Sequence, residues 1–149
     1  MDRFGASPWP RTADGAVAVG EPYIAPWWYP CNDHPVDKAT FTITAVVPAD
    51  LQVISNGALL GGSEPAGPGW QRWRWQHSDP MAPYLAFVAI GHYDILRQDT
   101  VFGPYLAAYD RGLPPPVAAA ARASIEQTPQ IIEFLSEIFG PYPFTNSAA

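Results

Sequence analysis

The most regular pattern in the chain is an alternation of apolar and polar positions over residues 40–47. Apolar residues occupy every second position from Phe41 to Val47, and threonines fill most positions between them. A period of two predicts a half-buried β-strand. A turn over residues 48–50 leads to a second short apolar run at 51–54. The sequence Ser55-Asn56-Gly57 after it favours a hairpin turn, so we expect a return strand over residues 58–60.

Several further segments have the length and pattern of strands. Trp73 and Trp75 alternate with arginines over residues 70–76, which predicts that the two indoles face a core. A continuous apolar run over 84–90 stops at a glycine, and residues 92–96 and 102–109 are two more candidates. Short strands at this close spacing are typical of an antiparallel sheet or sandwich.

The period changes to that of a helix after residue 116. Residues 117–123 are rich in alanine, and apolar residues then recur at steps of three and four from Ile125 to Phe139. Pro129 interrupts this stripe, so either one helix kinks there or a new helix begins with Thr128 as N-cap. The fold class expected is mainly β: an antiparallel β-saddle or sandwich, followed by a strand and a C-terminal helix.

Composition narrows the possible functions. The 18 prolines among 149 residues argue against a helical bundle, because a proline inside a helix costs about 3 kcal/mol. Residues 1–35 lack any period, and we expect extended, turn-rich backbone there whose tryptophans pack on neighbouring groups. The net charge of −6 argues against a nucleic-acid or anionic-membrane partner. The apolar run 81–90 is too short to span a bilayer, so we expect a soluble, cytoplasmic chain.

The densest polar cluster is Cys31-Asn32-Asp33-His34. A Cys and a His at this spacing are two potential zinc ligands, but a structural zinc site needs four. A Cys–His nucleophile pair is the second alternative. A turn, in which Asn and Asp side chains bond nearby backbone between two prolines, is the interpretation that we favour. Because Cys31 is the single cysteine, an intrachain disulfide is excluded.

Two other arrangements could carry chemistry. Glu21 and Asp33 are a possible carboxylate pair for acid–base work, although their separation in space does not follow from the sequence. The six tryptophans suggest a platform for sugars, against which we favour a core position for Trp73 and Trp75. The sequence contains no G-x-S-x-G, no H-E-x-x-H and no glycine-rich phosphate loop. We therefore expect no catalytic residues and no metal ligands in this chain by itself.

One segment is far more specific than these. Residues 28–41 read W-Y-P-C-N-D-H-P-V-D-K-A-T-F, which resembles a segment of bacterial zinc aminopeptidases of the aminopeptidase N and leukotriene hydrolase type. Further landmarks of that family lie before and after this segment, in the family's order: R-T-A-D-G at 11–15, G-E-P at 20–22, V-I-S-N-G at 53–57, W-R-W at 73–75, P-M-A-P-Y-L at 80–85, I-G-H-Y at 90–93 and F-G-P-Y-P-F at 139–144.

The resemblance implies a fold and a role. Residues 1–97 would be the later part of the family's N-terminal β domain, and residues 98–149 the first strand and helix of a thermolysin-like catalytic domain. The family's H-E-x-x-H and G-x-M-E-N motifs would follow residue 144, so we expect a fragment, inactive alone, of a zinc-dependent metallo-aminopeptidase. Zinc and a peptide substrate would belong to the parent enzyme, and this chain would pack on the catalytic domain.

The resemblance also assigns one functional residue. An acidic or amide residue nine positions before the proline of P-C helps to hold the free amino group of the substrate in this family, and that position is Glu21. A carboxylate suits this task because it forms a charge-assisted bond with an ammonium group. The alternative function is a stand-alone β-sandwich module that binds carbohydrate or protein. A third possibility is a remnant of marginal stability, since missing strands and missing catalytic sequence would expose an edge and an apolar helix face.

Overall fold

The computed structural model describes residue 7 and residues 9–148. The chain divides into two compact units, residues 1–92 and residues 93–149. We describe each unit by itself.

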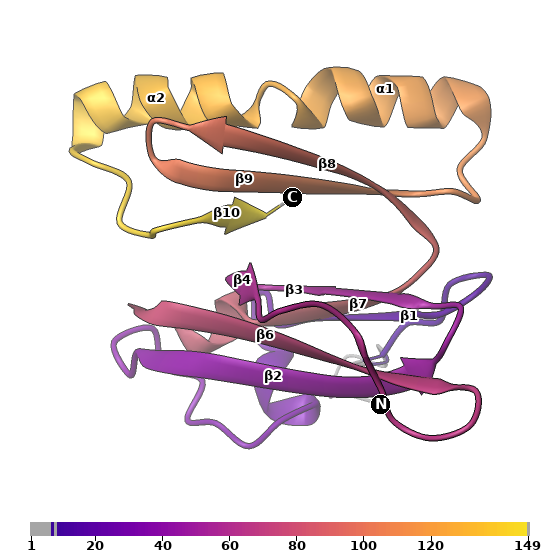
Figure 1. Cartoon of the computed structure of the whole chain (residues 1–149). Coiled ribbons are helices and arrows are strands. Elements are labelled where there is room, and N and C mark those ends of the chain that lie inside the picture. The colour runs from indigo at the N-terminus through magenta and orange to yellow at the C-terminus, as the bar shows by residue number, and fades with distance from the viewer. Residues whose placement is uncertain (1–6, 8, 149) are drawn as a thin grey trace. The chain divides into compact units, whose positions relative to one another are not determined.

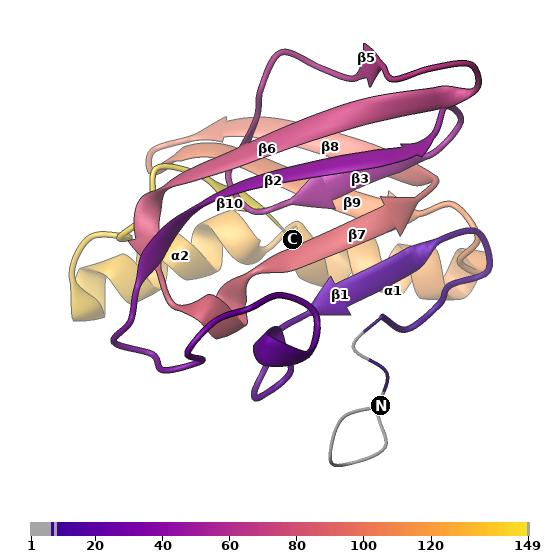
Figure 2. The ribbon, with the colours of Figure 1, turned by 90° about the horizontal axis from the view of Figure 1, so that it is seen from below.

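The first unit contains two antiparallel sheets (Figures 1 and 2). One sheet has the order β1–β7–β3, with β1 at Ala16–Val19, β3 at Gln52–Ser55 and β7 at Phe87–Gly91. The other has the order β2–β6–β4, and the short β5 also pairs with β6. Its strands are β2 at Ala39–Pro48, β4 at Ala58–Leu59, β5 at Glu64–Pro65 and β6 at Trp70–Met81. Two 3₁₀ turns, η1 at Ala25–Trp27 and η2 at Pro83–Leu85, complete the unit.

Side chains of β6 join the two sheets. Trp75 is 2% exposed, and its Nε1–H donates to the carbonyl oxygen of Val53 on β3 at 3.0 Å. Four residues earlier, Gln71 Nε2 donates to the carbonyl oxygen of Leu51 at 2.6 Å. Positions 71 and 75 share one face of the strand because successive side chains alternate. The alternation predicted for β2 is confirmed, and the sandwich is confirmed with it.

The hairpin predicted at Asn56-Gly57 is wrong. Strand β3 pairs with β7, whereas β4 pairs with β6, so the chain passes from one sheet to the other at this turn. Gly57 has a φ of 87° and approaches the carbonyl of Gln76 so closely that a Cβ would overlap it. The Asn-Gly pair therefore serves a crossing between sheets, for which the local sequence looks the same as for a hairpin.

The strand predicted over residues 84–90 begins only at Phe87. Residues 83–85 form η2 instead, with Pro83 in its first turn and a hydrogen bond from the Leu85 amide to the carbonyl of Ala82 at 3.1 Å. Strand β1 was not predicted, since four residues are too few to show a period. The expectation that tryptophans of this region pack on neighbouring groups holds for Trp9 and Trp28, whose rings meet edge to face with centroids 5.8 Å apart. It holds less well for Trp27, which is 48% exposed.

The second unit is a three-stranded sheet covered by two helices. The sheet order is β10–β9–β8, with β8 at Tyr93–Thr100, β9 at Gly103–Asp110 and β10 at Ser147–Ala148, the last parallel to β9. Helices α1, Pro115–Ile125, and α2, Thr128–Phe139, run along one face (Figure 1). The core contains Tyr105, Ala107 and Tyr109, with Leu96, Ala121 and Ile125 packed against it.

The helical segment breaks between Ile125 and Thr128, so a new helix begins there rather than one helix kinking. The N-cap is Gln127, one residue before the predicted Thr128, and Pro129 lies buried in the first turn. Of the apolar stripe predicted from Ile125 to Phe139, Ile125, Thr128 and Ile132 are half-buried, whereas Leu135 and Phe139 are exposed. We call the exposed apolar side chains of α2 the α2 stripe: Ile131, Phe134, Leu135, Ile138 and Phe139.

Candidate functional site

Glu21 lies two residues after the end of β1 and lines a cavity of about 440 Å³ in the first unit. The cavity is otherwise formed by the two residues before Glu21 and by the segment that leads into β7: Val19, Gly20, Tyr84, Leu85, Ala86 and Phe87. Among these described lining residues, Glu21 alone carries a charge. The cavity thus combines one exposed carboxylate with a mostly apolar wall, an arrangement suited to an ammonium group attached to an apolar body.

The backbone before Glu21 is held tightly against this wall. Gly20 is buried, and a Cβ built on it would overlap the backbone of Tyr84. The carbonyl oxygen of Gly20 accepts a hydrogen bond from the Ile24 amide at 2.9 Å, which closes a turn into η1. Ala25, in that 3₁₀ turn, is fully buried. Glu21 is therefore presented on a short turn whose two ends are both packed.

The opposite wall of the cavity is held by two side chains far away in sequence. The hydroxyl of Tyr29 donates to the carbonyl oxygen of Pro83 at 2.8 Å. Asn56 Nδ2 donates to the carbonyl oxygen of Leu85 at 3.1 Å, and its Oδ1 accepts from the Phe87 amide at 2.8 Å. Sequence reasoning assigned no role to Tyr29 and interpreted Asn56 as a turn residue. Their one signal was membership of the motifs at 28–41 and 53–57.

The turn predicted for the Cys31–His34 cluster is present only in part: the hydrogen-bonded turn spans residues 34–37, at the end of the cluster, and its bonds differ from those expected. Asn32 Nδ2 donates to Asp37 Oδ2 at 2.7 Å rather than to the backbone, and the Asp37 amide donates to the carbonyl of His34 at 2.9 Å. The ring of His34 accepts from the Val36 amide at 3.3 Å. In the part of the chain that the structure describes, no group of three or more His, Cys, Asp or Glu side chains is arranged to hold a metal ion.

The carboxylate pair suggested by the sequence does not share a cavity. Glu21 lines the cavity described above, whereas Asp33 lies in the 31–37 turn, with a φ of 51°, and is absent from that lining. An arrangement for acid–base catalysis by these two carboxylates is therefore not present in the cavity.

A histidine between two carboxylates was not predicted. His92 Nδ1 lies 2.6 Å from Asp14 Oδ2, the His92 amide donates to the same oxygen at 3.0 Å, and His92 Nε2 lies 3.6 Å from Asp50 Oδ2. The hydrogen bond from the His92 ring, followed by that from its amide, holds the pKa of Asp14 below its usual value. This cluster ties the turn before β1 and the turn after β2 to the end of β7.

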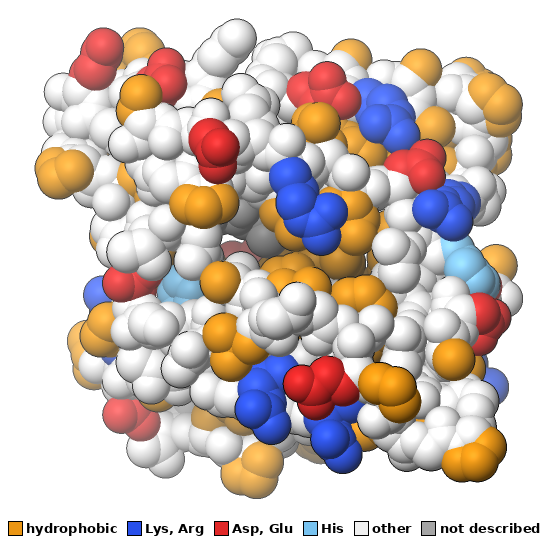
Figure 3. Space-filling view, viewed as in Figure 1, with side chains coloured by type: hydrophobic (Ala, Val, Ile, Leu, Met, Phe, Trp, Pro, Cys, Tyr) orange, Lys and Arg blue, Asp and Glu red, His pale blue; other side chains and the backbone are white. Residues whose placement is uncertain are grey.

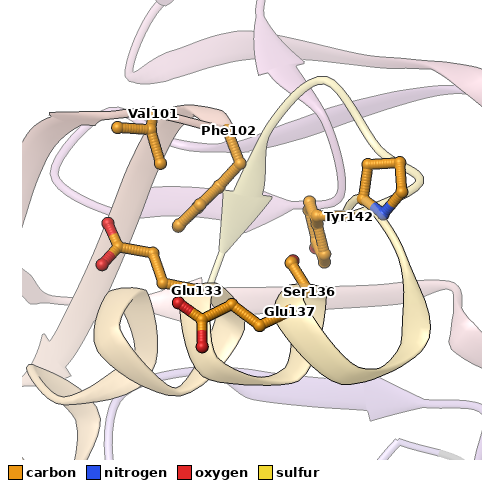
Figure 4. A pocket seen from close by; sticks show the side chains of 7 residues that line it. Val101, Phe102, Glu133, Ser136, Glu137 and Tyr142 are labelled. Carbon is orange, nitrogen blue, oxygen red and sulfur yellow. The ribbon is translucent and has the colours of Figure 1, made fainter.

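The second unit has a larger cavity, of about 740 Å³, in which no predicted site residue lies (Figure 4). It is lined by Val101, Phe102, Glu133, Ser136, Glu137, Pro141 and Tyr142. The rings of Phe102 and Tyr142 meet edge to face, with centroids 5.4 Å apart. Burial raises the pKa of the Tyr142 phenol, which therefore stays protonated at neutral pH.

The surface charges and the positions of the tryptophans complete the description. On the face seen in Figure 3, basic and acidic side chains are interspersed and form no extended basic patch. Trp75 is buried and Trp73 half-buried, as expected for core residues, whereas Trp27 and Trp70 are about half exposed. No helix in the described residues is both long and apolar enough to cross a membrane.

Comparison with known proteins relates this chain to a known family. Residues 14–85 match the Peptidase M1 N-terminal domain. Aminopeptidase M1 of Arabidopsis thaliana is 34% identical over 94 residues, which cover 63% of this chain and 10% of the relative. Human aminopeptidase N is 28% identical over 124 residues, covering 80% of this chain and 12% of the relative. The chain thus spans about a tenth of the length of these relatives.

Solved structures agree with these relatives. The crystal structure of an M1 zinc metallopeptidase from Deinococcus radiodurans superposes with a TM-score of 0.79 at 26% identity, covering 94% of this chain and 32% of that chain. The structure of its E323A mutant gives a TM-score of 0.78 at the same identity and coverage. The resemblance found in the motifs is therefore confirmed: the chain carries an M1 peptidase N-terminal domain and is related to the zinc metallo-aminopeptidases of that family.

Proposed function

We propose that this chain is part of a zinc-dependent aminopeptidase and that Glu21 helps to hold the free α-amino group of the peptide substrate. The observation that carries the proposal is the position of Glu21, a single carboxylate on the edge of a cavity with an apolar wall. A carboxylate in that setting pairs with an ammonium group through charge-assisted hydrogen bonds. The apolar wall disfavours a hydrated polar group and accommodates the adjoining carbon atoms of a ligand.

Related structures support recognition of a free amine. The E323A mutant of the M1 zinc metallopeptidase of Deinococcus radiodurans has been crystallised with a Tyr-Ser-Ala substrate, and the E323A mutant of a two-domain M1 zinc metallopeptidase with L-tryptophan or L-arginine. The three ligands differ in their side chains but share an α-amino group. A site that serves all of them needs a fixed anionic partner for that group, which is the role proposed for Glu21.

The domain assignment is part of the proposal. Residues 1–97 correspond to the later part of the N-terminal β domain, and residues 98–149 to the beginning of a thermolysin-like catalytic domain. The α2 stripe supports this assignment, because five exposed apolar side chains on one helix need a covering surface. Further catalytic-domain sequence is the surface that we propose.

The zinc ion belongs to the parent enzyme in this proposal. The described residues offer no group of ligands for it, so the metal does not fit this chain and no step of catalysis is assigned to the residues described. What the chain contributes is binding: a carboxylate to orient the amine, and a wall to exclude water on one side of it.

The test is hydrolysis by the full-length protein of an amino-acid p-nitroanilide, compared with its N-acetylated form. The proposal predicts turnover of the free-amine substrate only, loss of that turnover with a zinc chelator and recovery when zinc is added. Equal hydrolysis of both substrates would show that the free amine is not recognised. Activity that survives the chelator with no bound zinc would contradict the zinc-dependent part.

A further inference from the structure

We infer that Tyr29 and Asn56 are positioning residues, which fix the cavity wall at residues 84–87, together with the Pro83 that precedes it, and thereby set the direction of the Glu21 carboxylate. The inference rests on the proposed function for the identity of the ligand, a peptide ammonium group. It adds two residues that act on this group through Glu21 and do not touch the substrate themselves.

The wall depends on these two side chains because its own backbone structure is short. The 3₁₀ turn η2 has three residues, and the ladder with β1 begins only at the pair Val19–Phe87. Within η2, the carbonyl of Leu85 accepts from Asn56, and the carbonyl of Pro83 accepts from Tyr29 in addition to the Ala86 amide. Asn56 also accepts from the Phe87 amide, so one side chain bridges both ends of the step from η2 into β7.

Movement of the wall is transmitted to Glu21 through backbone contact. Val19 is paired in register with Phe87, and the next residue, Gly20, lies so close to Tyr84 that even a Cβ has no room. The two residues before Glu21 are therefore both seated on residues 84–87. A tightly packed contact of this kind leaves no free volume between the two segments, so a displacement of the wall also displaces the Glu21 backbone.

The Tyr29 ring is itself well fixed. Its edge contacts place the ring centroids of Trp28 and Phe41 at 4.6 Å and 6.1 Å. Burial, followed by the neighbouring Cys31 side chain, raises the pKa of the Tyr29 phenol, so the hydroxyl stays a donor throughout the neutral range. Replacement of Tyr29 by Phe keeps the ring contacts and removes the hydroxyl alone, which makes Tyr29→Phe the sharpest variant for the test.

The expected kinetic effect falls on substrate binding. An ammonium held by Glu21 is bound both before and during peptide hydrolysis, so its misalignment weakens the ground state and the transition state alike. Such a loss raises KM and leaves kcat nearly unchanged. Loss of one neutral hydrogen bond changes an equilibrium constant by roughly three- to tenfold. We expect a rise in KM of that order for Tyr29→Phe.

The experiment uses the full-length protein with Tyr29→Phe, Asn56→Asp and Tyr105→Phe. Asn56→Asp keeps the acceptor for the Phe87 amide and removes the donor to the Leu85 carbonyl. Tyr105→Phe is the matched control, because it too removes one hydroxyl that donates to a backbone carbonyl, that of Ile125, at 2.8 Å in the second unit. KM and kcat for an amino-acid p-nitroanilide are measured together with amide hydrogen exchange of the peptide containing residues 83–91.

The inference predicts that both first-unit variants raise KM and accelerate exchange within residues 83–87, whereas Tyr105→Phe changes neither. Unchanged KM in Tyr29→Phe, when Glu21→Ala does raise KM, overturns the inference and leaves the proposed function standing. Unchanged KM in Glu21→Ala defeats the proposed function instead, and local exchange then decides whether the two side chains hold the wall. Exchange that rises uniformly over the whole first unit overturns the positioning role, because it indicates general loss of stability.

Discussion

Replacement of Trp75 by Phe should lower the free energy of unfolding of the first unit by more than its modest change in size suggests. Trp75 is 2% exposed and connects the two sheets through its bond to the Val53 carbonyl. Phenylalanine fills part of the same space but has no N–H group. The variant therefore removes a hydrogen bond inside the sandwich and leaves a small void beside it.

The magnitude follows from these two losses. A buried carbonyl deprived of its donor costs about 1–3 kcal/mol. The missing ring atoms add about 1 kcal/mol, since removal of buried carbon atoms carries both a transfer and a cavity cost. The free energy of unfolding should fall by about 2–4 kcal/mol. At roughly 4–8 °C per kcal/mol for a unit of this size, the Tm of its transition should fall by at least about 8 °C.

The assay is urea unfolding followed by far-ultraviolet circular dichroism, which does not depend on the number of tryptophans. Trp70→Phe is the matched control, because Trp70 lies on the same strand and is 50% exposed. Surface substitutions usually change stability by less than about 0.5 kcal/mol. If Trp75→Phe and Trp70→Phe differ by less than that amount, the bond between the sheets does not stabilise the unit as argued.

Three further predictions concern single residues. Because the pKa of Asp14 is lowered in the folded state, its ionised carboxylate stabilises the fold at pH values above the usual pKa of 3.8. This contribution is lost as pH falls through the folded-state pKa. Asp14→Asn should therefore reduce the decrease in Tm measured below about pH 4. Burial lowers the pKa of His77 below its usual value of 6.5, so protonation of this ring favours the unfolded state as pH falls below 6.5. His77→Gln should therefore reduce the slope of the unfolding free energy against pH between about pH 7 and 5. Gly20→Ala should raise KM in the full-length protein and lower its Tm, because the added methyl group overlaps the Tyr84 backbone; unchanged values of both would refute that contact.

Sequence patterns predicted those strands and helices in which the apolar residues repeat along one face of a single element. Strand β2 was predicted because its period of two extends over eight residues. Pro129 indicated an interruption of the helical segment, but the sequence did not decide between a kink and the new helix that is present. Strand β1 was missed because four residues between turns have no measurable period. The crossing at Asn56 was missed because an Asn-Gly pair suits a hairpin equally well, and only the distant segments 85–87 and 76–77 decide between them.

For the candidate site, too, local sequence was informative and long-range contacts were not predictable. Glu21 was identified from its spacing to the P-C motif within a family resemblance, not from any property of its own. The cavity beside it needs Tyr84–Phe87, more than sixty residues later in the chain, so no local pattern could reveal it. The bond from Tyr29 to Pro83 joins residues separated by 54 positions, and the His92–Asp14 pair spans 78. Contacts at these separations depend on the completed fold.

The most direct test of the account is the effect of Glu21→Ala on the kinetics of the full-length protein with a free-amine substrate. The account predicts that KM rises by about tenfold or more, because a charge-assisted bond contributes more than a neutral one, while Glu64→Ala, which removes an exposed carboxylate from β5, leaves KM unchanged. If Glu21→Ala leaves both KM and kcat unchanged, Glu21 does not hold the amine and the central claim fails.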